Sequence, residues 1–112
     1  RRYIADRYLK GITNPKVILP YVPEYAVPVW HLFAIRCQDR DRLAEHLSQK
    51  GIGTNQHYPI AMHLQDCYAD LGIEKGALPI AEEISATELS LPMYYGMTEE
   101  EINYVIDAVN AF

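Results

Sequence analysis

The sequence has few basic residues, few cysteines and no long hydrophobic run. Ten Lys and Arg against fifteen Asp and Glu give a formal charge of -5, which opposes broad affinity for nucleic acid or anionic lipid. No apolar run approaches the length that spans a bilayer. The two cysteines, Cys37 and Cys67, have no framework spacing, which fits a reducing compartment better than a disulfide scaffold. We therefore expect a cytoplasmic protein without a nucleic-acid or membrane partner.

Signature motifs of several enzyme classes are also missing. The chain has no glycine-rich phosphate loop followed by Lys and Ser or Thr, no GxSxG elbow, and no CxxC or HExxH metal motif. Its acidic residues Glu82, Glu83 and 99–101 have the pattern of solvated helix faces and helix starts, where negative charge is favourable through the helix dipole.

The composition is that of one globular domain. The chain has 112 residues, of which 49% are hydrophobic and 22% charged, and it contains no repeat, low-complexity segment or linker. We expect residues 1–112 to form a single domain.

The first half of the chain predicts two helices and up to three strands. The apolar spacing predicts a helix over 1–14, and a short strand over 17–19 precedes a proline-rich loop. The run 29–37 (VWHLFAIRC) predicts the central strand, buried on both faces. A helix over 39–50 with Asp39 as its cap and a strand over 52–58 follow.

The second half predicts three helices and one strand. A short helix over 63–71 precedes a turn over 72–76, and Pro79 opens another helix. A brief strand over 89–93 follows. The last helix begins with a capping box from Thr98 and Glu101 and carries apolar residues at i, i+3, i+4 and i+7. This order of elements predicts an α+β fold.

The richest polar cluster is GIGTNQHYP at 51–59. It gathers hydrogen-bonding side chains at a strand end, where glycines allow close approach of a ligand, and strand alternation sends His57 and Tyr58 to opposite sheet faces. The alternative is an ordinary turn and strand, because lone histidines and glycine-flanked strands are frequent without any function.

A zinc site is a second alternative. His63 and Cys67 lie four residues apart on a predicted helix with His57 nearby, although this spacing matches no established motif. The other histidines offer less: we expect His31 to be a satisfied structural histidine inside the central strand and His46 to face solvent.

Five segments, taken in order, closely resemble the C-terminal domain of one family. They are VWHLFAIR, QKGIGTNQHYP, MHLQ, LPIAEEISATELSLPMYYGMTEEEI and YVIDAV. The family is DegT/DnrJ/StrS, the pyridoxal-phosphate (PLP)-dependent aminotransferases that act on nucleotide-linked keto sugars. The resemblance spans essentially the whole chain. It implies the small C-terminal domain of a fold-type-I PLP-dependent transferase, with a short, mainly antiparallel sheet packed against helices.

The resemblance also implies an activity for a longer protein. Such an enzyme moves an amino group from glutamate or glutamine to a nucleotide-diphosphate keto sugar, for cell-surface polysaccharide or related amino-sugar biosynthesis. Its N-terminal PLP-binding domain, with the Schiff-base lysine, is expected upstream of Arg1 and absent from this chain. None of the four lysines has the family's cofactor-lysine context: Lys10, Lys16, Lys50 and Lys75. The resemblance thus implies no catalytic and no cofactor-binding residue here, an inactive monomeric fragment without PLP, and a homodimer at full length.

By the same resemblance, the HYP segment lies near the bound sugar nucleotide. His57 and Tyr58 are then the main substrate-binding candidates, since both can donate hydrogen bonds to diphosphate or sugar oxygens and orient the keto carbon. Asn55 and His63 are further candidates, and Gln56 could line the same cleft. No metal ligand is implied.

Two positions depart from the family pattern. Ala61 and Tyr95 stand where proline is common, and the former puts a ligand role for His63 in doubt.

Some relatives carry histidine in place of the cofactor lysine and catalyse dehydration, which this sequence does not distinguish from amination. A free-standing small-molecule-binding α+β module without catalysis remains the alternative, and a zinc-binding domain is the less favoured one.

Overall fold

The computed structural model describes all 112 residues and contains a small sheet, four α-helices and two 3-10 helices. In chain order the elements are α1 (Arg2–Gly11), β1 (Val17–Ile18), β2 (Phe33–Cys37), α2 (Arg40–Gln49), η1 (Met62–Leu64), η2 (Asp66–Leu71), α3 (Pro79–Thr87), β3 (Glu88–Leu91) and α4 (Glu99–Asn110). The α+β prediction is confirmed. No helix is long and apolar enough to cross a membrane.

The sheet is antiparallel throughout, in the order β1-β2-β3. Strand β2 is therefore central, as predicted, but it begins at Phe33 rather than at Val29, which lies exposed before it. The burial of β2 alternates: Phe33, Ile35 and Cys37 are buried, whereas Ala34 and Arg36 are half-buried. The predicted burial on both faces was wrong, because only one face of the strand carries the main core.

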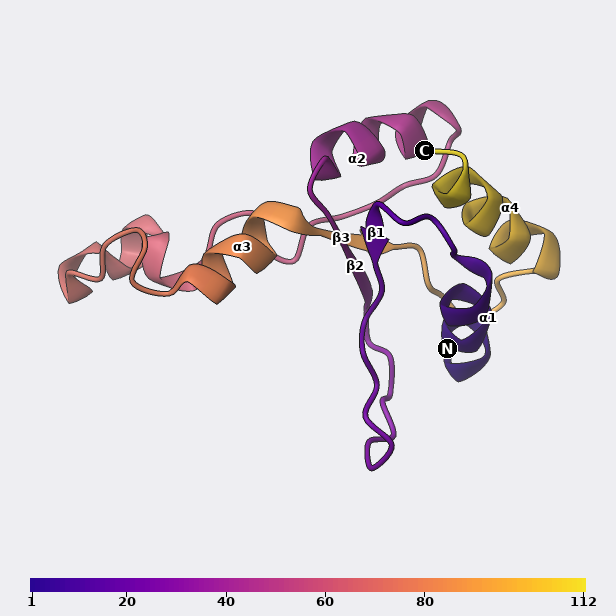
Figure 1. Ribbon diagram of the computed structural model, residues 1–112, viewed down its shortest axis with the longest axis horizontal. Coiled ribbons are helices and arrows are strands. Elements are labelled where there is room, and N and C mark those ends of the chain that lie inside the picture. Colours follow the sequence, from indigo (N-terminus) through magenta and orange to yellow (C-terminus); the bar gives the residue numbers. More distant parts are fainter.

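Helices α1, α2 and α4 gather around the sheet, as Figure 1 shows. Their buried side chains join the strands in one hydrophobic cluster, to which α4 contributes Ile102, Val105, Ile106 and Val109. These four form the predicted apolar stripe of the last helix, and the capping box between Thr98 and Glu101 is also confirmed.

Tyr8 ties α1 into the core. Its ring lies 5.0 Å from that of Phe33 in an edge-to-face arrangement, and its hydroxyl donates to the carbonyl of Pro92 at 2.8 Å. Burial raises the pKa of Tyr8, so its hydroxyl stays a donor. Three residues on, Gly11 lets α1 approach α4, because a Cβ there would come within 2.8 Å of the Ile106 side chain.

Other predicted elements also differ in the structure. Helix α1 ends at Gly11 instead of residue 14, because Ile12 is extended and Asn14 donates its amide to the carbonyl of Val109 at 2.8 Å. The predicted helix over 63–71 is divided into η1 and η2 by the extended Gln65. The segment 52–58 is not a strand. Only one isolated bridge, between Asn55 and Ser90, links it to the sheet.

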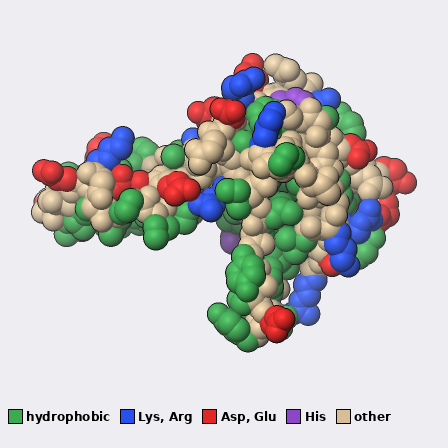
Figure 2. Space-filling model, viewed as in Figure 1, with side chains coloured by type: hydrophobic (Ala, Val, Ile, Leu, Met, Phe, Trp, Pro, Cys, Tyr) green, Lys and Arg blue, Asp and Glu red, His purple; other side chains and the backbone are tan.

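Two arms extend from this body: the loop between β1 and β2, and the segment from Tyr58 to Ile84 with η1, η2 and α3 (Figure 1). The radius of gyration is 15.4 Å, against roughly 13 Å expected for a compact chain of this length. Figure 2 shows apolar side chains along both arms. Their large exposed members include Tyr21, Tyr25, Val27, Ile60, Met62, Leu71, Leu78, Ile80 and Ile84.

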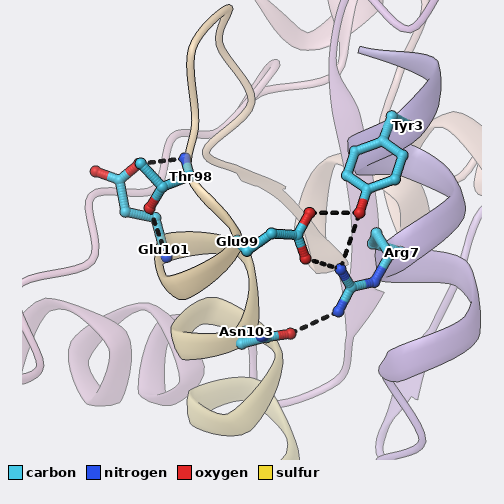
Figure 3. A network of polar contacts seen from close by, with 6 residues as sticks. All are labelled: Tyr3, Arg7, Thr98, Glu99, Glu101 and Asn103. Atoms are coloured by element: carbon cyan, nitrogen blue, oxygen red, sulfur yellow. Dashed lines mark hydrogen bonds and ion pairs between the residues drawn. The ribbon is translucent and has the colours of Figure 1, made fainter.

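A polar network fastens the start of α4 to α1 (Figure 3). The Glu99 carboxylate accepts hydrogen bonds from the Tyr3 hydroxyl and the Arg7 guanidinium, and Arg7 also donates to Asn103 at 2.6 Å. The bonds from Tyr3 and Arg7 hold the pKa of Glu99 below its ordinary value of 4.5. A lowered pKa means that the folded state favours the ionised carboxylate.

The stabilisation by Glu99 should therefore depend on pH. It is fully present above pH 4.5 and is lost as the pH falls through the lower pKa of the folded state. We expect Glu99→Gln to lower the free energy of unfolding at pH 7, and the difference from wild type to shrink in acid. Urea titrations of both proteins between pH 3 and pH 7 measure this difference in the free energy of unfolding. Glu100→Gln in the same helical turn is the control, and an equal effect from that variant would contradict the role of the network.

Core packing gives a second stability prediction. Leu43→Ala removes a fully buried side chain of α2 and should cost about 2 to 5 kcal/mol, whereas Leu71→Ala on the exposed arm should change stability by about 0.5 kcal/mol or less. Chemical denaturation of both variants measures this contrast. Similar losses would show that the arm is as closely packed as the body.

Candidate ligand-binding site

The candidate site lies where the irregular segment after Gly53 meets the second face of β3. All four residues of β3 are buried, and alternation sends Leu89 and Leu91 into the main core while Glu88 and Ser90 face the other way. The backbones of Asn55 and Ser90 exchange two hydrogen bonds, of 2.7 and 3.2 Å. This bridge brings the predicted polar cluster against the polar face of the strand.

His57 lies at the centre of this contact. Its Nδ1 is 2.9 Å from the Ser90 hydroxyl, and its Nε2 is 3.2 Å from the side-chain amide of Asn55. Its backbone N–H donates to the buried carboxylate of Glu88 at 2.6 Å. Asn55 and His57 were predicted as one site, and the structure places them in direct contact.

Two cavities open beside His57. The larger, of about 480 Å³, is mostly apolar and is lined by His57, Tyr58 and His63 and by further residues between Ile60 and Ser85. The smaller, of about 240 Å³, is more polar and includes Asn55, His57 and Ser90 in its lining. Tyr58 is largely exposed, with its ring 5.7 Å from that of His57. The predicted placement of these two rings on opposite sheet faces was wrong, because the segment is not a strand and both line the larger cavity.

His63 is buried and belongs to the arm from Tyr58 to Ile84. Its Nε2 lies 3.0 Å from the Glu82 carboxylate, which also accepts from the backbone N–H groups of Gly76 and Leu78 at 2.8 and 3.4 Å. Burial on its own would raise the pKa of Glu82, but these hydrogen bonds outweigh it and lower the pKa. Glu82 was interpreted as a solvated residue, whereas it ties three parts of the arm together.

The structure does not assemble the zinc alternative. Nowhere do three His, Cys, Asp or Glu side chains lie close enough together to hold a metal ion. His57 contacts Asn55 and Ser90, and His63 contacts Glu82. The thiol of the exposed Cys67 donates to the Gln65 side chain at 3.9 Å.

Predictions for the remaining histidines need correction. His31 is exposed and precedes β2 instead of lying within it. His46 does not face solvent freely, because its Nε2 lies 2.9 Å from the carbonyl of Ala108 and its ring 5.6 Å from that of Phe112. Both therefore have surroundings that periodicity alone did not indicate.

Sequence reasoning missed Glu88 and Ser90 as members of the site. Glu88 was not selected from the sequence, although it begins β3 and is only 3% exposed. The signal was present in the alternation Glu-Leu-Ser-Leu, which places two polar side chains on one strand face.

The site residues do not fit PLP by themselves. Neither cavity beside His57 is lined by a lysine for a Schiff base or by an arginine for the cofactor phosphate. Of the chain's lysines, Lys10 pairs with Asp6 and Lys16 donates to the carbonyl of Phe112. What the arrangement offers is a hydrogen-bonding surface beside an apolar groove.

Comparison with solved structures places this fold among the aminotransferases. S. venezuelae DesV, solved in complex with a ketimine intermediate, superimposes with a TM-score of 0.95 at 39% identity and covers 98% of this chain. Spr1654 from Streptococcus pneumoniae, solved in its PLP form, gives a TM-score of 0.85 at 25% identity. This chain corresponds to 30% and 29% of those two chains. The fold is thus that of a domain found in aminotransferases.

Sequence comparison specifies the family. The model of the DegT/DnrJ/EryC1/StrS aminotransferase family matches residues 1–110, and the chain belongs to this family. The dTDP-3-amino-3,4,6-trideoxy-alpha-D-glucose transaminase of Streptomyces venezuelae is 40% identical over 110 residues, which are 97% of this chain and 29% of that protein. The chain spans about 30% of the length of the curated relatives that it matches.

The Glu82 contacts yield a prediction for the arm. Glu82→Ala removes the acceptor of the Gly76 and Leu78 N–H groups and should speed amide hydrogen exchange over residues 76–78. Glu83→Ala is the matched control, because the neighbouring Glu83 side chain pairs only with Arg36. Exchange that is equally fast in both variants would show that Glu82 does not hold this turn.

Proposed function

We propose that the chain is the C-terminal small domain of a longer PLP-dependent aminotransferase, where it forms one wall of the substrate cleft. The substrate is a nucleotide-diphosphate keto sugar, and glutamate or glutamine donates the amino group. The observation that carries this proposal is the polar cluster around His57 in a domain of this family whose site contains no lysine. Such a site can bind and orient a substrate, while the reaction depends on groups from elsewhere.

The relatives support the choice of substrate. The S. venezuelae relative is named as a transaminase of a dTDP-linked amino sugar, and it aligns with nearly the whole of this chain. A sugar nucleotide offers hydroxyl and phosphate oxygens, which suit the imidazole, phenol and amide groups of His57, Tyr58 and Asn55. The product of such a reaction suits cell-surface polysaccharide or related amino-sugar biosynthesis in the cytoplasm.

The arms support the proposal that the domain is part of a larger protein. A free-standing binding module gains nothing from two projecting arms with exposed tyrosine, valine and isoleucine side chains, since contiguous exposed apolar surface favours association. In the proposed enzyme, a larger N-terminal domain and the second subunit of a homodimer cover these surfaces. Alone, the domain is expected to be inactive and to bind no PLP.

The residues of this chain bind the substrate and position it for the reaction. When bound in the complete enzyme, PLP supplies the electron sink for amino transfer. His57 and Tyr58 hold the sugar nucleotide from one side, so that its keto carbon faces the cofactor, and Asn55 supports His57. His63 contributes to the same wall through its place in the larger cavity while its ring remains bonded to Glu82.

Substitution of the two leading residues tests the proposal. In the complete enzyme, His57→Ala and Tyr58→Phe should each lower kcat/KM about 10-fold, because each removes a hydrogen bond to the substrate, and PLP absorbance should stay intact. Tyr95→Phe is the control, since this tyrosine is fully exposed and lines neither cavity. Steady-state kinetics equal to wild type in both site variants would remove these residues from the site.

A further inference from the structure

The imidazole of His57 has a hydrogen-bond partner at each ring nitrogen. Ser90 Oγ lies 2.9 Å from Nδ1, and Asn55 Nδ2 lies 3.2 Å from Nε2. A neutral imidazole carries one donor and one acceptor nitrogen, so the partners decide which nitrogen holds the proton. Each partner has a second hydrogen bond that fixes its own direction.

Glu88 fixes the direction on the Nδ1 side. The backbone N–H of His57 can only donate, and it occupies Glu88 Oε2 at 2.6 Å. The other oxygen, Oε1, lies 2.6 Å from the Ser90 hydroxyl. An ionised carboxylate has only acceptors, so the hydroxyl proton of Ser90 points to Glu88. The Ser90 oxygen is then left to accept a proton from His57 Nδ1.

Gln56 fixes the direction on the Nε2 side. Its backbone N–H donates to Asn55 Oδ1 at 2.9 Å, which identifies the oxygen end of that side-chain amide. The nitrogen end of Asn55 therefore faces His57 and donates to Nε2. Both sides thus require the same tautomer, with the proton on Nδ1 and the lone pair on Nε2.

We infer that Glu88 and Ser90 are positioning residues that set His57 in its Nδ1–H tautomer and make Nε2 a hydrogen-bond acceptor at the smaller cavity. Glu88 and Ser90 are 3% and 5% exposed, so little water reaches them to reorient the chain of bonds. Asn55 is exposed, and a ligand can replace its amide. Given the proposed function, the group that His57 recognises is a hydroxyl of the sugar, whereas unprotonated phosphate oxygens require a different donor, such as the Tyr58 phenol.

Nitrogen-15 NMR of the histidine rings in the full chain tests this inference directly, because two-bond proton correlations distinguish the two tautomers. The wild-type spectrum should show His57, assigned with His57→Ala, protonated at Nδ1. Glu88→Gln should reverse the His57 tautomer. The Gln oxygen must accept from the His57 N–H, so its NH2 group donates to Ser90, the hydroxyl turns to His57 Nδ1, and the ring proton moves to Nε2.

Asn55→Ala is the matched control and should keep the Nδ1–H tautomer, because Glu88 and Ser90 are unchanged. An Nε2–H ring in wild type or in Asn55→Ala would overturn the inference, and both results can be read even where Glu88→Gln fails to fold. Retention of Nδ1–H in a folded Glu88→Gln variant would overturn it as well. The spectra need no substrate, so a failure of the proposed function appears separately, as unchanged kinetics of His57→Ala.

Discussion

The antiparallel pairing of β2 with β3 determines both the core of the domain and the position of the candidate site. The register pairs Ile35 with Leu89 and Phe33 with Leu91, which places one face of both strands under the helices. Because side chains alternate, the same register turns Glu88 and Ser90 to the opposite face. A shift by one residue would send the leucines into the polar cluster and the carboxylate into the core. The register of β2 and β3 therefore specifies both the fold and the candidate site.

The site and the arms complement each other. The body provides buried, hydrogen-bonded groups with fixed directions, while the arm from Tyr58 to Ile84 provides an apolar groove beside them. Tyr58 follows His57 directly and so joins the two environments. A ligand with a polar sugar and less polar portions could contact both. This division fits the proposed role, in which a domain with no lysine at its site binds and orients the substrate.

Local patterns in the sequence predicted the elements that local chemistry determines. The capping box at Thr98 and the apolar stripe of α4 are examples, and the cluster at Asn55 and His57 is a further one. Tertiary contacts decided the rest. Helix α1 stops early where Asn14 binds Val109, and the segment after Gly53 meets β3 through one bridge instead of a full ladder. The role of Glu88 was missed because the His57 backbone N–H that donates to its carboxylate comes from a distant segment, and short-range periodicity does not reveal that contact.

In the proposed enzyme, the His57 cluster faces a nucleotide-linked sugar. A crystal structure of the complete enzyme with PLP and the bound sugar nucleotide would show whether it does. We expect a sugar hydroxyl within hydrogen-bond distance of His57 Nε2 and the Tyr58 phenol within reach of the sugar or diphosphate. A sugar nucleotide bound elsewhere, with His57 contacting only protein atoms, would contradict it.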